Sequence, residues 1–263
     1  MSSGARSLRR GRPPVWSYWV VLPAILIVWA LLAGLIQSPL LPTPVEVLDT
    51  LVREAGSGEL WHHLGATLRR VLFAFVLAMT LGTLIGIAMG RSAMTNALFD
   101  PLLVLLLNLP ALVTIILMYV WFGLVEVAAV MAVVINKVPN VAVTVREGAR
   151  SLDYRLEEMA TVYRFSRWQR FREVWVPQLF PYLMAATRGG LALIWKIVLV
   201  VELLGRSSGV GFQLHMAFQV FDVAAILAYS LAFIAVVQLI ELGILQPLER
   251  RSSRWRQPEA AHA

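Results

Sequence analysis

The chain of 263 residues contains no cysteine, only two lysines and few charged side chains of any kind, at 15% of the total. Without cysteine, disulfide bonds, thiolate metal ligands and a cysteine nucleophile are excluded. A soluble globular domain carries about a quarter charged residues. The low charge, with 59% hydrophobic residues and a mean hydropathy of +0.71, therefore indicates an integral membrane protein. Since each spanning helix needs about 20 apolar residues, the length allows around six spans and no sizeable soluble domain.

The sequence also lacks the residues of a phosphate-binding loop, in which a glycine precedes the lysine. Neither Lys137 nor Lys196 follows a glycine. An intramembrane serine protease would need a serine and a histidine together inside the membrane, but Ser208 and His215 fall in a predicted loop between spans. We therefore expect no catalytic residue, no metal site and no cofactor in this chain.

Charge-free apolar runs predict four membrane spans, over residues 16–36, 71–89, 101–124 and 223–240. Two more runs, 127–145 and 182–204, can span if the isolated charges of Lys137, Arg188, Lys196 and Glu202 are tolerated. The predicted fold class is an all-α membrane protein with about six transmembrane helices. In this scheme 1–15 is a basic tail, 16–249 the transmembrane domain with a polar loop at about 146–178, and 250–263 a second tail.

The distribution of arginine predicts that both termini are cytoplasmic, because basic residues concentrate on that side of a membrane. Sixteen arginines fall in the tails and loops assigned to the cytoplasm, against two, Arg53 and Arg206, on the opposite side. This bias explains the pI near 10.4 without a nucleic-acid partner. Arg69 and Arg70, at the outer start of the second span, fit the scheme poorly, and we expect their side chains to extend to the membrane interface.

Three glycines, Gly82, Gly86 and Gly90, recur every four residues in the second predicted span. This spacing places them on one face of a helix, where a second helix can approach closely. We favour packing within the chain over a contact between subunits.

The segment from 147 to 181 is the one long polar stretch, and it predicts two short amphipathic helices. Asp153 is a plausible N-cap for the first helix, and Ser166 with Gln169 forms a capping box for the second. Val176 should end the second helix, because it precedes Pro177. From composition alone, the helices suit a membrane surface and a docking site for a partner equally well.

Several short motifs resemble permease subunits of ATP-binding-cassette importers. The polar loop is similar to their Glu-Ala-Ala loop in three runs, Glu158-Met159-Ala160, Ser166-Arg167-Trp168 and Val176-Pro177. Four further runs resemble the branch that imports aliphatic sulfonates, taurine, nitrate and pyrimidine precursors: Leu41-Pro42-Thr43-Pro44, Trp121-Phe122-Gly123-Leu124, Glu202-Leu203-Leu204-Gly205 and Ser208-Gly209-Val210-Gly211. The resemblance extends over about 16–250 of the chain.

The chain departs from the family pattern at two positions of this loop. Met159 stands where the family has its second alanine, and Arg164 stands where it has a glycine. A glycine takes the left-handed backbone conformation at little cost, whereas a residue with a Cβ loses roughly 1 kcal/mol or more. Either the turn is built differently here or Arg164 is strained.

The resemblance implies the type I importer permease fold in a bacterial inner membrane. It also implies a second permease copy, two ATPase subunits that bind ATP and magnesium, and an external solute-binding protein. The loop from 150 to 177 would be the coupling segment that docks on the ATPase, with Trp168 and Phe171 as apolar anchors. The residues implied for coupling are Glu158, Ala160, Arg164, Ser166, Trp168, Phe171 and Pro177.

Polar residues inside the predicted spans are candidates for a translocation path: Asn108, Asn136, Lys137, Lys196 and Glu202. A charge in mid-membrane costs roughly 2.5–3.5 kcal/mol, so each charged side chain should face a cavity or a partner. For Lys196 and Glu202, an ion pair with another helix and a role in the path are equally open. Glu202, the sole acidic residue in a predicted span interior, can neutralise only one lysine. We therefore expect Lys137, beside Asn136, to attract an anion along the path.

The best interpretation is a permease subunit of an ATP-driven importer for a small, anionic solute. Two alternatives remain, a six-span secondary transporter that needs no ATPase and a membrane scaffold that only docks a cytoplasmic partner.

Overall fold

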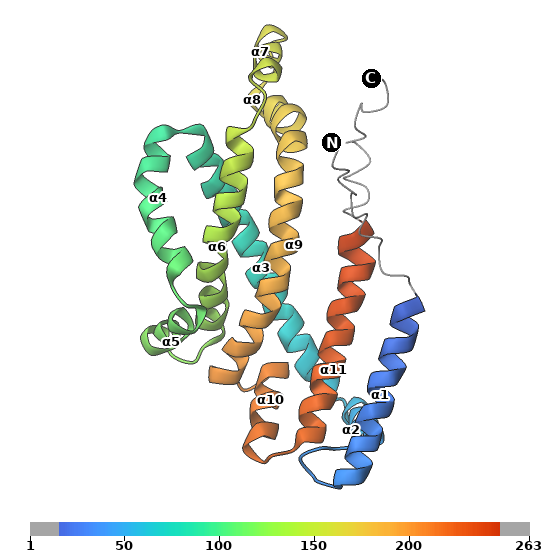
Figure 1. The fold of residues 1–263 in the computed structure, drawn as a ribbon. Helices are drawn as coiled ribbons and strands as arrows, with labels where there is room; N and C mark the ends of the chain where they lie inside the picture. Colours follow the sequence, from blue (N-terminus) through green and yellow to red (C-terminus); the bar gives the residue numbers. More distant parts are fainter. Residues whose placement is uncertain (1–15, 248–263) are drawn as a thin grey trace, which may run out of the picture.

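The computed structural model describes residues 16–247, and every element in this range is a helix (Figure 1). The long helices are α1 (Trp16–Ile36), α3 (Glu59–Arg91), α4 (Ala93–Asn108), α6 (Glu126–Arg150), α9 (Val176–Gly205) and α11 (Val223–Ile240). The shorter elements are α2 (Pro44–Ser57), α5 (Ala111–Phe122), α7 (Tyr154–Val162), α8 (Arg167–Gln169), α10 (Val210–Gln219) and two π-helical segments, η1 (Arg170–Trp175) and η2 (Glu241–Leu245). The all-α prediction is confirmed, while the tails 1–15 and 250–263 lie outside the described residues.

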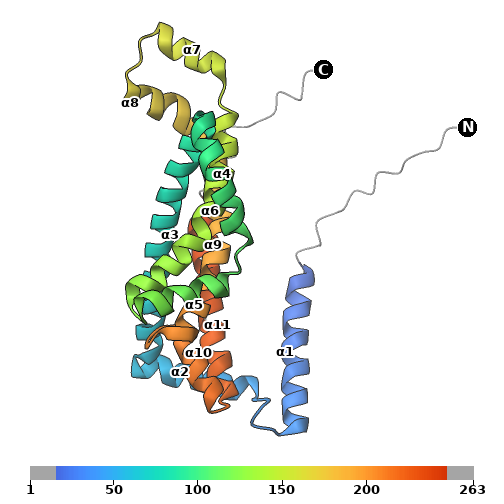
Figure 2. The same ribbon diagram turned by 90° about the vertical axis from the view of Figure 1, so that its left-hand side faces the viewer.

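Four helices in the described range are long and apolar enough to cross a membrane: Glu59–Arg91, Glu126–Arg150, Arg167–Gly205 and Val223–Leu245. The bent pair α4 and α5 makes a fifth candidate. Helix α1 has the bounds of the first predicted span, and Figure 2 shows it standing apart from the bundle. The short helices α2, α5 and α10 lie toward one end of the bundle, and α7 and α8 project from the other (Figures 1 and 2).

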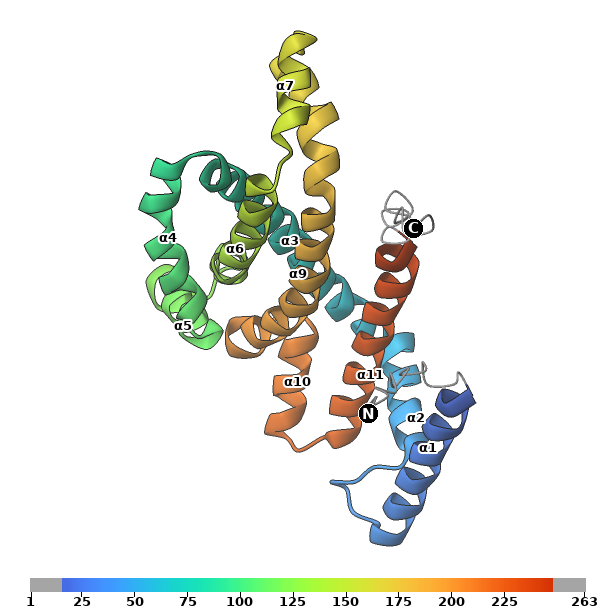
Figure 3. The same ribbon diagram turned by 45° about the horizontal axis from the view of Figure 1, so that its top comes forward.

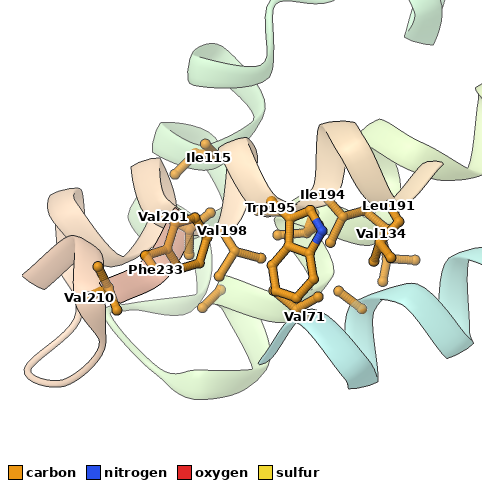
Figure 4. Close-up of a cluster of buried hydrophobic side chains, with 14 of the residues drawn as sticks. Val71, Ile115, Val134, Leu191, Ile194, Trp195, Val198, Val201, Val210 and Phe233 are labelled. Atoms are coloured by element: carbon orange, nitrogen blue, oxygen red, sulfur yellow. The ribbon is translucent and has the colours of Figure 1, made fainter. Parts of the chain in front are cut away.

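Helices α3, α6 and α9 form the centre of the bundle, with α4 and α5 on one side and α11, α2 and α1 on the other (Figure 3). Their shared core surrounds Trp195 of α9 (Figure 4). The Trp195 ring meets Phe233 of α11 edge to face, with 5.8 Å between ring centroids. Val71 of α3 and Val134 of α6 belong to the same buried cluster. Lipid tails are as apolar as these side chains, so the helices associate through close packing rather than through the hydrophobic effect.

The glycine face of α3 packs against α6, which confirms the prediction of packing within the chain. A Cβ on Gly82 would lie 2.6 Å from the Cβ of Val141, and a Cβ on Gly86 would lie 2.6 Å from the backbone oxygen of Ala142. Real Cβ atoms do not approach other atoms so closely, so only glycine allows this separation of the two backbones.

The predicted span over 101–124 is not a single straight helix. The chain forms α4 and α5 instead, which meet at an angle of 99°. Pro110 cannot donate a backbone hydrogen bond, and Leu109 before it is extended, with φ −73° and ψ 124°. An extended residue before proline ends a helix, because the proline ring disfavours the helical conformation there. The apolar run is therefore uninterrupted in sequence but bent between its two helices.

Candidate functional site

Helix α7 begins and ends as its sequence predicts. The Asp153 side chain accepts a hydrogen bond from the backbone nitrogen of Arg155 at 2.8 Å, which confirms the N-cap. At the other end, the Phe165 nitrogen donates to the oxygen of Ala160 at 2.8 Å, and Arg164 donates to Thr161 at 3.1 Å. These are the two bonds of the Schellman motif, whose C′ residue is left-handed and usually glycine.

Arg164 occupies that C′ position with φ 52°. The turn is therefore the one that a glycine would build, and Arg164 carries the strain of the left-handed conformation, roughly 1–2 kcal/mol. Of the two alternatives that the sequence left open, the strained arginine is the one that the structure shows.

The second helix of the loop starts at a capping box, as predicted. Gln169 donates its backbone nitrogen to the Ser166 hydroxyl at 3.2 Å, and Ser166 donates its own nitrogen to the Gln169 side chain at 2.9 Å. The predicted end at Val176 is wrong, because the helix continues without interruption from Arg167 to Gly205. The backbone N–H of Val176 bonds to the oxygen of Phe171 in a π turn. This shift in hydrogen bonding brings Pro177 to the start of α9, where its missing donor is tolerated.

The aromatic residues of the loop form a partly exposed stack. Trp168 is 66% exposed and Phe171 36% exposed, and their rings stack with 5.8 Å between centroids. Glu158 is exposed on α7, whereas Ala160 is fully buried beneath it. The loop thus presents an acidic side chain and two aromatic rings to the surroundings at the end of the bundle where α7 and α8 project (Figure 2).

Lys137 lies buried between α6 and α9, with 4% of its surface exposed. Its ammonium donates one long hydrogen bond, 3.4 Å, to the backbone oxygen of Gly189. Its methylene stem approaches Gly190, where an added Cβ would lie 3.1 Å from Lys137 Cε. Within the described residues no carboxylate forms an ion pair with this ammonium, so none of them compensates its charge.

The other path candidates do not gather around Lys137. The side-chain amide of Asn136 donates to the oxygen of Ala132 at 3.2 Å, and that of exposed Asn108 donates to the oxygen of Val104 at 2.7 Å. Both amides thus satisfy carbonyls of their own helices. Lys196 lies exposed on α9.

Glu202 pairs with Arg70 in the interior, and the expectation that Arg70 extends to the membrane interface is wrong. The Arg70 Nη1 atom lies 2.6 Å from Glu202 Oε1, and the two residues are 2% and 0% exposed. Arg70 Nε also donates to Glu126 at 2.7 Å. Arg70 stays in the interior because two carboxylates bind its guanidinium there. These two ion pairs offset the free energy lost by removing the charge from water.

These residues belong to a larger group, named here the capping cluster: His63, Thr67, Arg70, Glu126, Glu202 and Ser208. Helix α10 has no side-chain cap at its own N-terminus. Three of its first free N–H groups are bound by the cluster instead. Gly209 donates to His63 Nδ1 at 3.0 Å, Val210 to Thr67 Oγ1 at 2.8 Å and Gly211 to Glu202 Oε2 at 2.9 Å. Arg70 also binds Ser208, so α3, α6 and α9 together fix the start of α10.

Comparison with known protein families identifies the family of this chain. The model of the family described as "Binding-protein-dependent transport system inner membrane component" matches residues 78–245. The chain belongs to this family. It is a multi-pass permease subunit of a binding-protein-dependent importer, as the sequence predicted.

Relatives of the permease match it over most of its length. The putative aliphatic sulfonates transport permease protein SsuC of Bacillus subtilis is 32% identical over 92% of this chain and 88% of its own. The taurine transport system permease protein TauC of Escherichia coli is 33% identical over 89% of this chain and 87% of its own.

Solved structures show the same fold. The permease resembles a chain of an amino acid ABC transporter determined with histidines, with a TM-score of 0.60 and 21% identity over 77% of this chain and 98% of that one. A chain of the MetNI methionine ABC transporter gives a TM-score of 0.58, with 16% identity over 80% and 98%. The type I importer permease fold is confirmed.

Sequence reasoning placed Glu202 in the permease correctly within a span, but missed its partners. One signal in the sequence could have pointed to Arg70. In a chain with few charged residues, an arginine and a glutamate that both lie within membrane helices are expected to pair, because an isolated charge there is costly. The structure also explains Gly211, since a Cβ there would lie 2.8 Å from the Cβ of Glu202.

Proposed function

We propose that this permease forms the translocation path for a small anionic solute. It works with a second permease copy, two ATPase subunits that bind ATP and magnesium, and an external solute-binding protein. The family supports the coarse assembly, and relatives named for aliphatic sulfonates and taurine support a solute with a sulfonate or similar anionic group.

The observation that carries the anionic substrate is Lys137. Burying an ammonium in a membrane protein without a partner is costly. The one acidic residue of the predicted span interiors, Glu202, is committed to Arg70 and leaves the lysine uncompensated. A transported anion that passes beside α6 and α9 would supply the missing charge.

The coupling segment is the loop from 150 to 177. Exposed Trp168 and Phe171 would fill a pocket on the ATPase, and Glu158 would add a polar contact at its edge. The helix that follows the loop without a break, Arg167–Gly205, supports this role because a rigid helix transmits movement along its length.

The termini of the permease would be cytoplasmic. In Figure 1, α1 runs toward the end of the bundle that holds α2 and α10, and α11 runs away from it, toward the end that carries α7. A reporter fused after Arg256 should therefore be cytoplasmic, and a reporter inserted at Gly56-Ser57-Gly58 should be external. Two reporters on the same side would contradict the six-span arrangement.

Transport in proteoliposomes tests the path. Lys137→Met keeps the length of the side chain and removes its charge, and it should lower uptake of the anion at least about tenfold, or ~1.4 kcal/mol. ATPase binding and ATP hydrolysis should persist. Lys137→Arg is the matched control that keeps the charge, and Lys196→Met removes the other, exposed lysine.

Three results would separate the possible roles. Unchanged uptake by Lys137→Met would remove Lys137 from the path. Uptake by the permease alone, driven by a gradient without an ATPase, would favour a secondary transporter. Binding of a cytoplasmic partner without any uptake would favour a scaffold.

A further inference from the structure

The end of α3 is tied to the loop that follows α6 through one ion pair. Arg91, the last residue of α3, places its Nη2 atom 2.8 Å from the carboxylate of Glu157 on α7. Glu157 is largely covered, with its side chain 14% exposed. Among the described residues it is the ion pair that links these two helices, and it lies at the base of the projecting loop.

Trp175 completes this contact from the third side. Its indole Nε1 donates to Glu157 Oε1 at 2.9 Å, and the guanidinium of Arg91 lies over its ring, 4.9 Å from the centroid. Trp175 is the last residue of the π turn, directly before α9. A cation, a carboxylate and an aromatic ring from three helical segments therefore meet at one point, named here the Arg91 junction.

The Arg91 junction continues into the exposed aromatic stack. The ring of Phe171 lies 6.3 Å from that of Trp175, edge to face, and 5.8 Å from that of Trp168. Trp168 is 66% exposed. An unbroken series of ring contacts thus leads from the surface of the loop to the end of α3.

We propose that the Arg91 junction transmits movement of the coupling loop to α3, as a second route beside the direct continuation into α9. Arg91 and Glu157 are positioning residues in this inference, which rests on the proposed function. The reason is geometric. The loop is covalently joined to α6 and α9, whereas α3 contacts the loop through the side chains of the junction and otherwise follows it only indirectly, by packing on α6 along its glycine face. If the junction opens, α9 still follows the loop directly, but α3 keeps only the indirect route through the bundle.

Neutral substitutions test the junction in the complete transporter in proteoliposomes, and Glu157→Gln is nearly isosteric as well. Arg91→Gln and Glu157→Gln each remove the ion pair, and Glu157→Gln keeps an oxygen acceptor for Trp175. Each should lower the number of solutes transported per ATP hydrolysed by about tenfold, within the usual range for coupling between sites. Affinity for the ATPase should stay unchanged. Arg53→Gln, the same charge change as Arg91→Gln at an exposed position of α2 outside the coupling segment, is the control and should keep the wild-type ratio.

The double variant distinguishes a junction from two separate effects. Because either substitution opens the same contact, Arg91→Gln with Glu157→Gln should be no worse than either alone. Losses that multiply in the double variant, or three variants with the wild-type ratio, would overturn the inference.

Labels give a readout that a merely structural role would not move. The chain has no cysteine, so a single cysteine at exposed Ala88 on α3 or Ala185 on α9 can carry a fluorophore without background. ATP should change both signals in the wild type. In Glu157→Gln the signal at 185 should persist and the signal at 88 should become smaller, whereas two signals of wild-type size would overturn the inference. If neither label responds in the wild type and no ATPase binds, the proposed function itself fails.

Discussion

Replacing Glu202 with glutamine would test whether the capping cluster holds the bundle together. The substitution keeps the shape of the side chain and removes its charge. The carboxylate accepts hydrogen bonds from Arg70 Nη1 at 2.6 Å, Thr67 Oγ1 at 2.9 Å and the Gly211 nitrogen at 2.9 Å. Glutamine has one acceptor oxygen in place of two, so its amide group must face at least one of these donors.

The expected cost follows from the burial of Arg70. Removing one partner of a buried ion pair costs about 3–5 kcal/mol, because the other charge stays in the interior. Arg70 keeps Glu126, at 2.7 Å and 3.1 Å, so we expect the lower end, about 3 kcal/mol. At about 2–4 °C for each kcal/mol in a chain of this size, the melting temperature should fall by about 6–12 °C.

Thermal unfolding of the purified permease in detergent, followed by tryptophan fluorescence, measures this loss. Glu126→Gln is the matched control. Its side chain is 37% exposed, and water can replace part of what Arg70 loses, so its melting temperature should fall by about half as much. Equal shifts for the two variants, or a wild-type melting temperature for Glu202→Gln, would refute the reasoning that burial makes Glu202 the dominant partner.

The remaining predictions concern packing, strain and docking. Gly86→Ala should lower the free energy of unfolding by about 1–3 kcal/mol, because the added Cβ meets the backbone of α6. Gly65→Ala, on the same helix, has nothing within 4 Å of its Cβ and should raise the free energy of unfolding by about 0.5–1 kcal/mol, and equal melting temperatures for the two variants would contradict this. Arg164→Gly should raise stability by about 1 kcal/mol by relieving the left-handed conformation, and a lower melting temperature would show that the arginine side chain contributes more than the strain costs. Trp168→Ala should weaken ATPase binding by about 2 kcal/mol at an unchanged melting temperature, since the ring is 66% exposed; pull-down with the ATPase measures this, and unchanged binding would place the loop on the membrane surface instead.

Local features of the fold could be predicted because the atoms involved are close in the chain. The Asp153 cap spans two residues and the Ser166 capping box spans three, so their side chains reach the backbone whatever the rest of the chain does. The glycine face of α3 could be predicted for a similar reason, since the helical period alone aligns it. The identity of the facing helix, α6, required the structure.

Proline shows why local rules were insufficient elsewhere. Pro110 breaks a helix that an apolar run predicted to be continuous, and Pro177 lies in a continuous helix that was predicted to end. The difference lies in the preceding residues, which are extended before Pro110 and form a π turn before Pro177. Both prolines disfavour an ordinary α-helical residue before them, but the presence of a proline alone does not tell whether the chain answers with an extended residue or with a π turn.

The candidate site was predictable in part. The burial of Lys137 follows from its place in an apolar run, but the exposure of Lys196 depends on the rotation of α9, which packing in the bundle determines. The Arg70 to Glu202 pair joins residues 132 positions apart, and no local pattern specifies that contact.

The dependence of α10 on distant side chains orders the assembly of the protein during synthesis. Its first N–H groups find acceptors on α3 and α9, so α10 can settle only after those helices have met. Arg70 enters the membrane long before Glu202 is made, but Glu126 on α6 becomes available sooner and can hold the arginine beside the glycine face. Helices α3 and α6 thus form the first stable pair, and α9 then supplies the second carboxylate. The N-terminus of α10 docks on the capping cluster after these three helices have met. A ribosome-bound chain that stops before residue 202 should therefore already have α3 and α6 paired through Arg70 and Glu126, before the second carboxylate of Arg70 has been made.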